Sequence, residues 1–203
     1  MSSAAVRERH RRTMQGNPAR LRGPRVLGRR WRVIPLAVGV SVVVLVALTG
    51  KLFIWPAPGS SPAHADAVLV LPGGRGDRLR RALDLMDRGV APLLILPGGA
   101  EPGWAAAKPL CGRLEPYRVI CAGKLIDSVR AQARWAREQH LGLVLVVTSR
   151  YNMTRARLDL HRCLGQGFAM SSSSSKDPAT TKVRRVADEW ISFIQDGLLH
   201  RSC

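Results

Sequence analysis

The stretch LVLVVTSRYNMTRARLDLHRC, residues 143–163, decides the fold of this chain. It opens with a continuous run of Val and Leu, passes through a short polar segment and continues as a helix. A buried parallel strand has this composition, and ligands of open α/β sheets collect where such strands end and helices begin. The stretch therefore predicts a central strand followed by a helix, with Ser149, Tyr151, Asn152 and Arg155 at a ligand-binding edge.

Further strands and helices alternate on both sides of this stretch. We expect strands over residues 67–71, 92–96, 117–121, 143–148 and 167–170, and helices from Leu79 to Gly89 and over 104–114, 129–140, 153–164 and 183–199. Pro109 should interrupt or kink the helix over 104–114. This alternation predicts an α/β domain over residues 66–200 with a Rossmann-like, three-layer parallel sheet. The serine run at 171–175 predicts a mobile loop, because such a composition does not support packing.

Ahead of the domain, Val33 to Trp55 contains a single charge, Lys51, and is long enough to cross a bilayer. We therefore expect one N-terminal transmembrane helix over 33–55 that contacts membrane lipid, and a Pro-, Gly- and Ser-rich linker over 56–65. A buried core helix and a cleaved signal peptide, with Ala63-His-Ala65 as the cleavage site, are the alternatives. The first lacks enough chain to cover it, and the second has an unusually long stretch before the apolar run.

The distribution of charge predicts the orientation of this helix. The net charge is +18, and 10 of the 32 Lys and Arg residues lie in residues 1–32, which we interpret as a basic cytoplasmic tail. Positive flanks stay in the cytoplasm, so we expect a single-pass protein of the plasma membrane whose C-terminal domain is extracytoplasmic. The domain is itself basic, which suits an anionic partner, but no nucleic-acid recognition motif is present and we expect no nucleic acid.

The four cysteines, Cys111, Cys121, Cys163 and Cys203, would face an oxidising compartment in this topology. Cys111 and Cys121 are nearest in sequence and could pair, although the sequence leaves the pairing open. Their spacing with histidine matches no zinc pattern, so we expect no metal.

Two glycine turns follow the first two expected strands. Gly73 and Gly74 lie between a strand and a helix, where backbone N–H groups bind anions, and Gly98 and Gly99 hold the same position after the next strand. Arg78 offers a bidentate partner for phosphate or carboxylate. Tight turns that need glycine are the alternative explanation, and Arg155 could instead pair with an acid such as Asp66.

These segments resemble the YdcF/SanA/ElyC family, whose members contain the DUF-218 domain. The resemblance rests on 66–78, with its Val-Leu-Val-Leu-Pro-Gly-Gly run, on 89–99 and above all on 146–156, and it covers 66–199. It implies an envelope protein with one membrane helix and a Rossmann-like domain. It also implies a role in envelope integrity, at the undecaprenyl carrier or peptidoglycan precursors, and S-adenosylmethionine binding for one branch.

The chain departs from the pattern of that family at four positions. Asn152 stands in place of His, Val129 of Thr, Gln132 of Glu or Asn, and Pro97 of Ser. Asn and Gln form hydrogen bonds but do not exchange protons near neutral pH, so the sequence leaves open whether the protein is an enzyme, and no cofactor is specified. We predict a site for a small phosphorylated or nucleotide-like molecule, in a diverged binding protein or an enzyme. Its candidate residues are Gly73, Gly74, Arg78, Gly98, Gly99, Ser128, Gln132, Ser149, Tyr151, Asn152 and Arg155.

Overall fold

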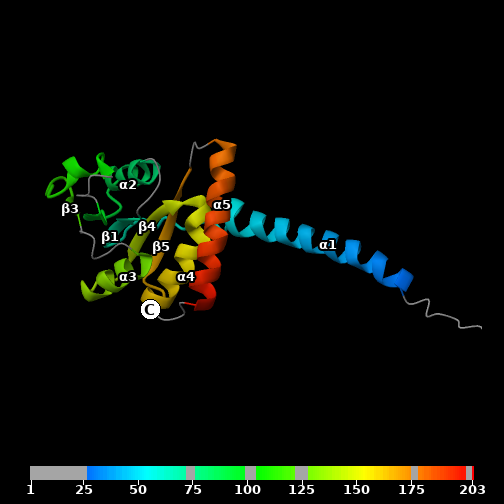
Figure 1. Cartoon of the computed structure of the whole chain (residues 1–203). Coiled ribbons are helices and arrows are strands. Elements are labelled where there is room, and N and C mark those ends of the chain that lie inside the picture. Colours follow the sequence, from blue (N-terminus) through cyan, green and yellow to red (C-terminus); the bar gives the residue numbers. More distant parts are fainter. Residues whose placement is uncertain (1–26, 72–75, 99–103, 122–127, 175–177, 200–202) are drawn as a thin grey trace, which may run out of the picture. The chain divides into compact units, whose positions relative to one another are not determined.

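A parallel sheet forms the centre of the α/β domain, as the sequence predicts (Figure 1). The computed structural model of the chain describes residues 27–71, 76–98, 104–121, 128–174, 178–199 and Cys203. In these residues, five strands are paired in the order β3-β2-β1-β4-β5, all parallel. The strands are β1 (Ala67–Val70), β2 (Leu93–Ile95), β3 (Arg118–Ile120), β4 (Val144–Ser149) and β5 (Phe168–Ser173). The order reverses between β1 and β4, where ligands of such sheets usually bind.

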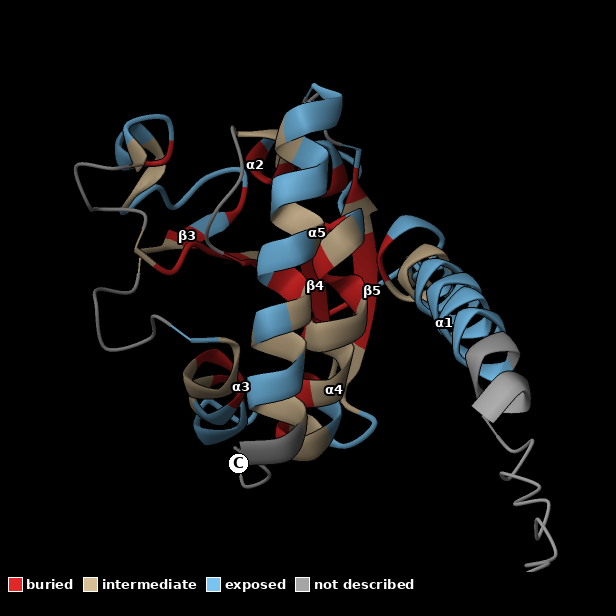
Figure 2. Cartoon of the chain, turned by 45° about the vertical axis from the view of Figure 1, so that its right-hand side comes forward, coloured by how far each residue is buried: buried red, intermediate tan, exposed pale blue. Residues whose placement is uncertain are grey.

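Helices cover both faces of the sheet, so the three-layer prediction is confirmed (Figures 1 and 2). On one face lies α2 (Asp77–Asp87), and on the other lie α3 (Val129–Glu138) and α4 (Met153–Leu164), with α5 (Ala179–Ile194) packed beside α4. Alternate residues of each strand point to opposite faces. Val147 of β4 accordingly packs with α2, and Val146 packs with α3 and α4.

The N-terminal apolar helix is present. It consists of α1 (Leu27–Thr49) and the π-helical turn η1 (Gly50–Ile54), and the segment Val33–Ile54 is long and apolar enough to cross a membrane. The described residues up to Val43 belong to one unit, and those from Val44 onward belong to a second compact unit. The last turns of this helix therefore belong to the same unit as the α/β domain.

Phe53, at the end of the apolar helix, is buried in the domain. It is 1% exposed, and its ring centroid lies 5.2 Å from that of Trp190 and 6.2 Å from that of Phe193, both on α5. The Trp190 Nε1–H also donates a hydrogen bond to Thr49 Oγ1 at 3.0 Å. The C-terminal end of the helix thus contributes to the hydrophobic packing of the domain.

The segment 56–65, which we expected to be a linker, packs closely against the domain. Gly59 lies against β5, the edge strand of the sheet, and a Cβ at this position would be 1.9 Å from the backbone oxygen of Met170. The Arg157 guanidinium donates hydrogen bonds to the carbonyls of Ala57 and Pro58 at 3.1 and 3.4 Å. Glycine is needed at Gly59 because any side chain would push this segment away from the strand.

The structure differs from the sequence prediction at the serine run. We expected a mobile loop, but β5 continues through Ser173, and Ser171 and Ser173 are buried. Ser171, Ser172 and Ser173 pair in register with Val147, Thr148 and Ser149 of β4. Pairing with a long neighbouring strand supplies the stability that serine side chains lack, so tertiary context overrides composition here.

Two of the expected helices also differ. The helix expected at 104–114 is replaced by turns and short 3₁₀ segments, among them η3 (Lys108–Leu110). Pro109, where an interruption was expected, removes a backbone donor that an α-helix would need. The last helix, expected at 183–199, begins at Ala179 and ends at Ile194, after which the π-helical turn η6 (Gln195–Leu199) follows. The strand and helix boundaries elsewhere agree to within a few residues.

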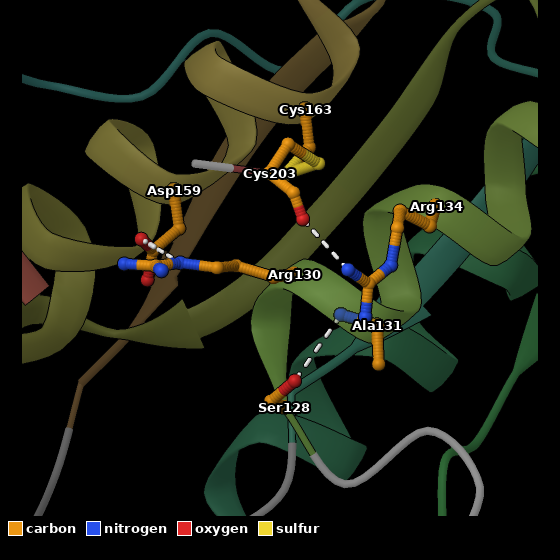
Figure 3. Close-up of a disulfide and its surroundings, with 7 residues drawn as sticks. All are labelled: Ser128, Arg130, Ala131, Arg134, Asp159, Cys163 and Cys203. Carbon is orange, nitrogen blue, oxygen red and sulfur yellow. Dashed lines mark hydrogen bonds and ion pairs between the residues drawn. A yellow bond between two sulfur atoms is a disulfide. The ribbon is translucent and has the colours of Figure 1, made fainter. Parts of the chain in front are cut away.

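All four cysteines are paired. Cys111 bonds Cys121, the pairing that sequence proximity favoured, and Cys163 bonds Cys203. The second disulfide attaches the C-terminal residue to α4, and the Arg134 guanidinium donates to the Cys203 carbonyl at 2.6 Å (Figure 3). The disulfide and this hydrogen bond thereby attach Cys203 to both α4 and α3.

Candidate functional site

The predicted ligand edge contains a buried guanidinium, that of Arg78, which forms hydrogen bonds with other residues of the domain. Arg78, in the first turn of α2, is 3% exposed, and its Nε–H donates to Ser149 Oγ at 2.8 Å. Its Nη1 donates to the Leu71 carbonyl at 3.1 Å. Burial lowers the pKa of Arg78, and interaction with Tyr151 opposes this effect. Arg78 and Ser149 therefore lie together, as expected, but they join the ends of β1 and β4 to α2.

Arg155 is also held by side chains of the domain. Its guanidinium donates to Glu189 Oε2 at 2.9 Å, to Asp196 Oδ2 at 3.3 Å and to Asn152 Oδ1 at 3.0 Å. The alternative that Arg155 pairs with an acid thus describes the structure, although Asp66 is not the acid. Asp66 instead accepts hydrogen bonds from the backbone N–H groups of Gly142 and Leu143, which precede β4.

The remaining predicted residues have different surroundings. Ser128 is the N-cap of α3, and its Oγ accepts a hydrogen bond from the Ala131 N–H at 3.2 Å (Figure 3). Gln132 is buried in the same helix, and Tyr151 accepts a hydrogen bond from Arg185. Gly98 lies in a turn with φ of 69°, which glycine adopts readily. Gly73, Gly74 and Gly99 lie outside the described residues.

Glu189 is a buried carboxylate that the sequence did not single out. It is 8% exposed, and burial raises its pKa, although the attraction of Arg155 offsets part of this effect. A carboxyl whose pKa is raised by folding keeps its proton more tightly in the folded state. Its contribution to stability is present below the unfolded pKa of 4.5 and is lost as the pH rises through the folded value.

We therefore expect Glu189→Gln to change the pH dependence of stability. The thermal midpoint of the wild type should fall relative to that of Glu189→Gln as the pH rises from 4.5 toward neutrality, because only the wild type must release a proton from this buried site. Thermal melts over this range measure the difference. The exposed Glu138→Gln serves as the control and should follow the wild type. A constant difference between the wild type and Glu189→Gln would contradict the assignment.

Three cavities lie beside the predicted edge, toward β5, and Arg150 lines each of them. One of about 410 Å³ is bounded by α2 and the end of β5, and one of about 390 Å³ by β5 and the segment after η1. The third, of about 190 Å³, lies between η1 and α5. Their polar lining consists of Arg and Ser side chains with Asp77, Asp84, Tyr151 and Lys182.

Arg150 is the cation best placed to bind a ligand in these cavities. Its side chain is exposed, and its guanidinium forms no hydrogen bond or ion pair with the part of the chain that the structure describes. By contrast, Arg81 donates to Ser171 Oγ at 3.1 Å and to Asp84 at 2.7 Å, and Arg80 is paired with Asp77. The carboxylates of the largest cavity are therefore already neutralised, and the charge of Arg150 is available.

A longer prediction for the last strand would have identified Arg150 and the serines of β5 as candidate site residues. Arg150 directly follows β4 and lies shortly before the start of α4. In the sequence, an arginine at such a position cannot be distinguished from an ordinary surface charge. If β5 is aligned with β4 over its full length, Ser173 pairs with Ser149 and the next residue, Ser174, comes beside Arg150. The apolar run at 168–170 was too short to suggest this length.

Comparison with known proteins identified no protein similar to this chain. No family model, no curated protein and no solved structure matches this chain. Function must therefore be argued from the site itself.

Proposed function

We propose that this chain is a membrane-anchored cell-envelope protein of the YdcF/SanA/ElyC type that binds a small anionic or phosphorylated ligand beside Arg150. The observation that carries the proposal is that Arg150, without a partner in the described chain, borders three cavities at the carboxyl ends of β4 and β5. Arginine binds phosphate and carboxylate groups through two parallel hydrogen bonds. Serine hydroxyls of β5 offer further donors on the same side.

The charge of the cavities supports an anionic ligand. The cavities of about 390 and 190 Å³ have no carboxylate among their described lining residues, and each has two cations. Arg150 is shared, with Arg81 in the first and Lys182 in the second. Because the smaller cavity also includes Phe53 and Ile54, it offers an apolar wall beside a positive charge. This combination suits a phosphorylated lipid carrier as well as a soluble phosphate compound.

Two features support an extracytoplasmic domain. The basic residues before Val33 favour a cytoplasmic N-terminus, so the domain would lie on the other side of the plasma membrane. The two disulfides are typical of an oxidising compartment, as expected outside the cytoplasm. A role in peptidoglycan or lipid-carrier metabolism, and so in envelope integrity, agrees with this location.

Binding without catalysis is the mechanism that we favour. A catalytic group must reach the substrate, and Arg78, Ser149, Arg155 and Asn152 are engaged with one another or with Glu189 and Asp196. The order of the strands supports a second candidate, an enzyme for a nucleotide or S-adenosylmethionine, because such ligands bind where the order reverses. That position lies at β1 and β4, whereas Arg150 lies toward β5.

Ligand-induced thermal stabilisation of the full chain in detergent tests the proposal. Pyrophosphate or undecaprenyl phosphate should raise the melting temperature, and Arg150→Ala should weaken binding about tenfold or more, since a hydrogen bond to a charged group contributes about 1.5–3 kcal/mol. Arg137→Ala, an exposed arginine of α3, is the matched control and should bind like the wild type.

Each alternative gives a different result in this experiment. Stabilisation by S-adenosylmethionine that is insensitive to Arg150→Ala would favour the nucleotide-type enzyme at the β1–β4 edge. Turnover of a phosphorylated substrate by the wild type would exclude the non-catalytic mechanism. If none of the ligands stabilises the wild type, the binding proposal is wrong.

A further inference from the structure

We infer that the outer side of α5 lies on the surface of the membrane that the chain itself crosses. This side carries an apolar stripe, which we define as Val183, Ala187, Ile191 and Ile194. The inference requires that the helix ending at Ile54 spans the bilayer, as the proposed function does, but it does not depend on any ligand. The partner of this surface is the interfacial layer of the lipid bilayer.

The apolar stripe has no function within the domain. Much of one side of α5 is exposed (Figure 2). Val183, Ile191 and Ile194 are 71%, 59% and 49% exposed, and Ala187 is also exposed. The other side of α5 faces the domain, where Glu189 binds Arg155. A helix with one side packed on its domain should be polar on the other, so an exposed apolar stripe indicates a partner that is not water.

The stripe adjoins the surface by which α5 contacts the end of the apolar helix. Successive residues of an α-helix are about 100° apart around its axis. Measured from Trp190, Phe193 therefore lies about 60° to one side. Val183, Ile194 and Ala187 lie about 20–60° to the other side, and Ile191 lies at about 100°. Trp190 thus separates the side that faces the domain from the stripe.

The contacts of the apolar helix show which way the membrane lies. The Phe53 ring contacts the rings of Trp190 and Phe193. Thr49 lies one turn closer to the middle of the apolar helix, and its hydroxyl oxygen accepts a hydrogen bond from the Trp190 indole N–H. Phe53 thus lies against Trp190 and Phe193, and Thr49 contacts Trp190, so the contact on the side of the bilayer is with Trp190, the residue that borders the stripe.

The residues after Thr49 place the membrane boundary at the level of α5. Lys51 and Trp55 are exposed, Trp55 by 73%, and Lys and Trp residues at the ends of membrane helices lie among the lipid headgroups. From Val183 to Ile194 the stripe extends about 16 Å along the axis of α5, so the whole helix would lie along the interface. Arg184, which is exposed, is suited to anionic headgroups beside it.

Site-specific fluorescence of the full chain in vesicles of phosphatidylcholine and phosphatidylglycerol tests this inference. All four native cysteines are in disulfides, so one introduced cysteine gives a unique thiol for an environment-sensitive dye. The test position is Ile191→Cys, and the matched control is Asp188→Cys, an exposed residue of the same helix outside the stripe. Val46→Cys, within the apolar helix, reports whether that helix is inserted.

We expect lipids with a nitroxide near the headgroup to quench the dye at Ile191 strongly and the dye at Asp188 weakly, while iodide in the water does the reverse. Equal quenching at the two positions would overturn the inference and leave the membrane span intact, provided that Val46 is quenched by nitroxide deep in the bilayer. Quenching between labelled chains at Ile191 that depends on the protein-to-lipid ratio would assign the stripe to a second copy instead. Absence of quenching at Val46 would overturn the span and the inference together.

Discussion

Replacing Phe53 by alanine will lower the free energy of unfolding of the Val44–Cys203 unit by about 3–5 kcal/mol, the usual cost of removing a buried aromatic side chain. The ring is almost completely buried against Trp190 and Phe193 and lies at the end of a helix whose residues before it are mostly exposed. The variant leaves a cavity between η1 and α5 that the backbone cannot close. Thermal or denaturant unfolding in detergent micelles measures the loss.

Trp55→Ala is the control for this prediction. Trp55 is larger than Phe53 and two residues away, but it is 73% exposed, so its removal should change the stability in micelles far less. If the two variants are destabilised equally, the end of the apolar helix does not pack in the domain as the structure shows.

Removing the disulfide between Cys163 and Cys203 will destabilise the domain by about 4 kcal/mol, as the chain-entropy model gives for a loop of this length. The bond joins residues 40 positions apart, whereas Cys111 and Cys121 are 10 apart. The double variant Cys163→Ala, Cys203→Ala should therefore lose more stability than Cys111→Ala, Cys121→Ala, for which the same model gives about 3 kcal/mol.

Thermal melts of the two double variants measure this order, and alkylation of free thiols in intact cells checks that the bonds form. We expect no thiol of the wild type to react until a reductant is added, because an extracytoplasmic domain is oxidised. Free thiols in cells would argue against the proposed orientation. A larger loss for the shorter loop would show that local packing, and not loop length, determines the effect.

The segment 143–163 allowed the fold to be predicted because both signals in it are local. The apolar run forms β4, and the following residues form α4 with the expected start and end. The serine run failed for the opposite reason, since its strand exists through pairing with β4, which composition does not report. At 104–114 we expected a helix interrupted or kinked at Pro109, and the structure has turns and short 3₁₀ segments there.

The candidate site could be predicted only in its general location. Parallel strands end on one edge of the sheet, so Arg78 and Ser149 were expected to meet there, and they do. The sequence does not show that the guanidinium groups of Arg78 and Arg155 form hydrogen bonds within the domain, because their partners are distant in the chain. Ser149 is 71 residues from Arg78, and Glu189 is 34 residues from Arg155. The sequence likewise cannot distinguish Arg150, which has no such partner in the described chain, from other exposed arginines.

The close contact of Gly59 with β5 means that the end of the apolar helix and the segment after it fold together with the domain. An edge strand presents backbone groups that other strands can pair with, and segment 56–65 covers this edge. A protease that cut the chain after Trp55 would free the covering segment at one end and remove Phe53 from between Trp190 and Phe193. The released domain would then be less stable and more prone to aggregate than the full chain.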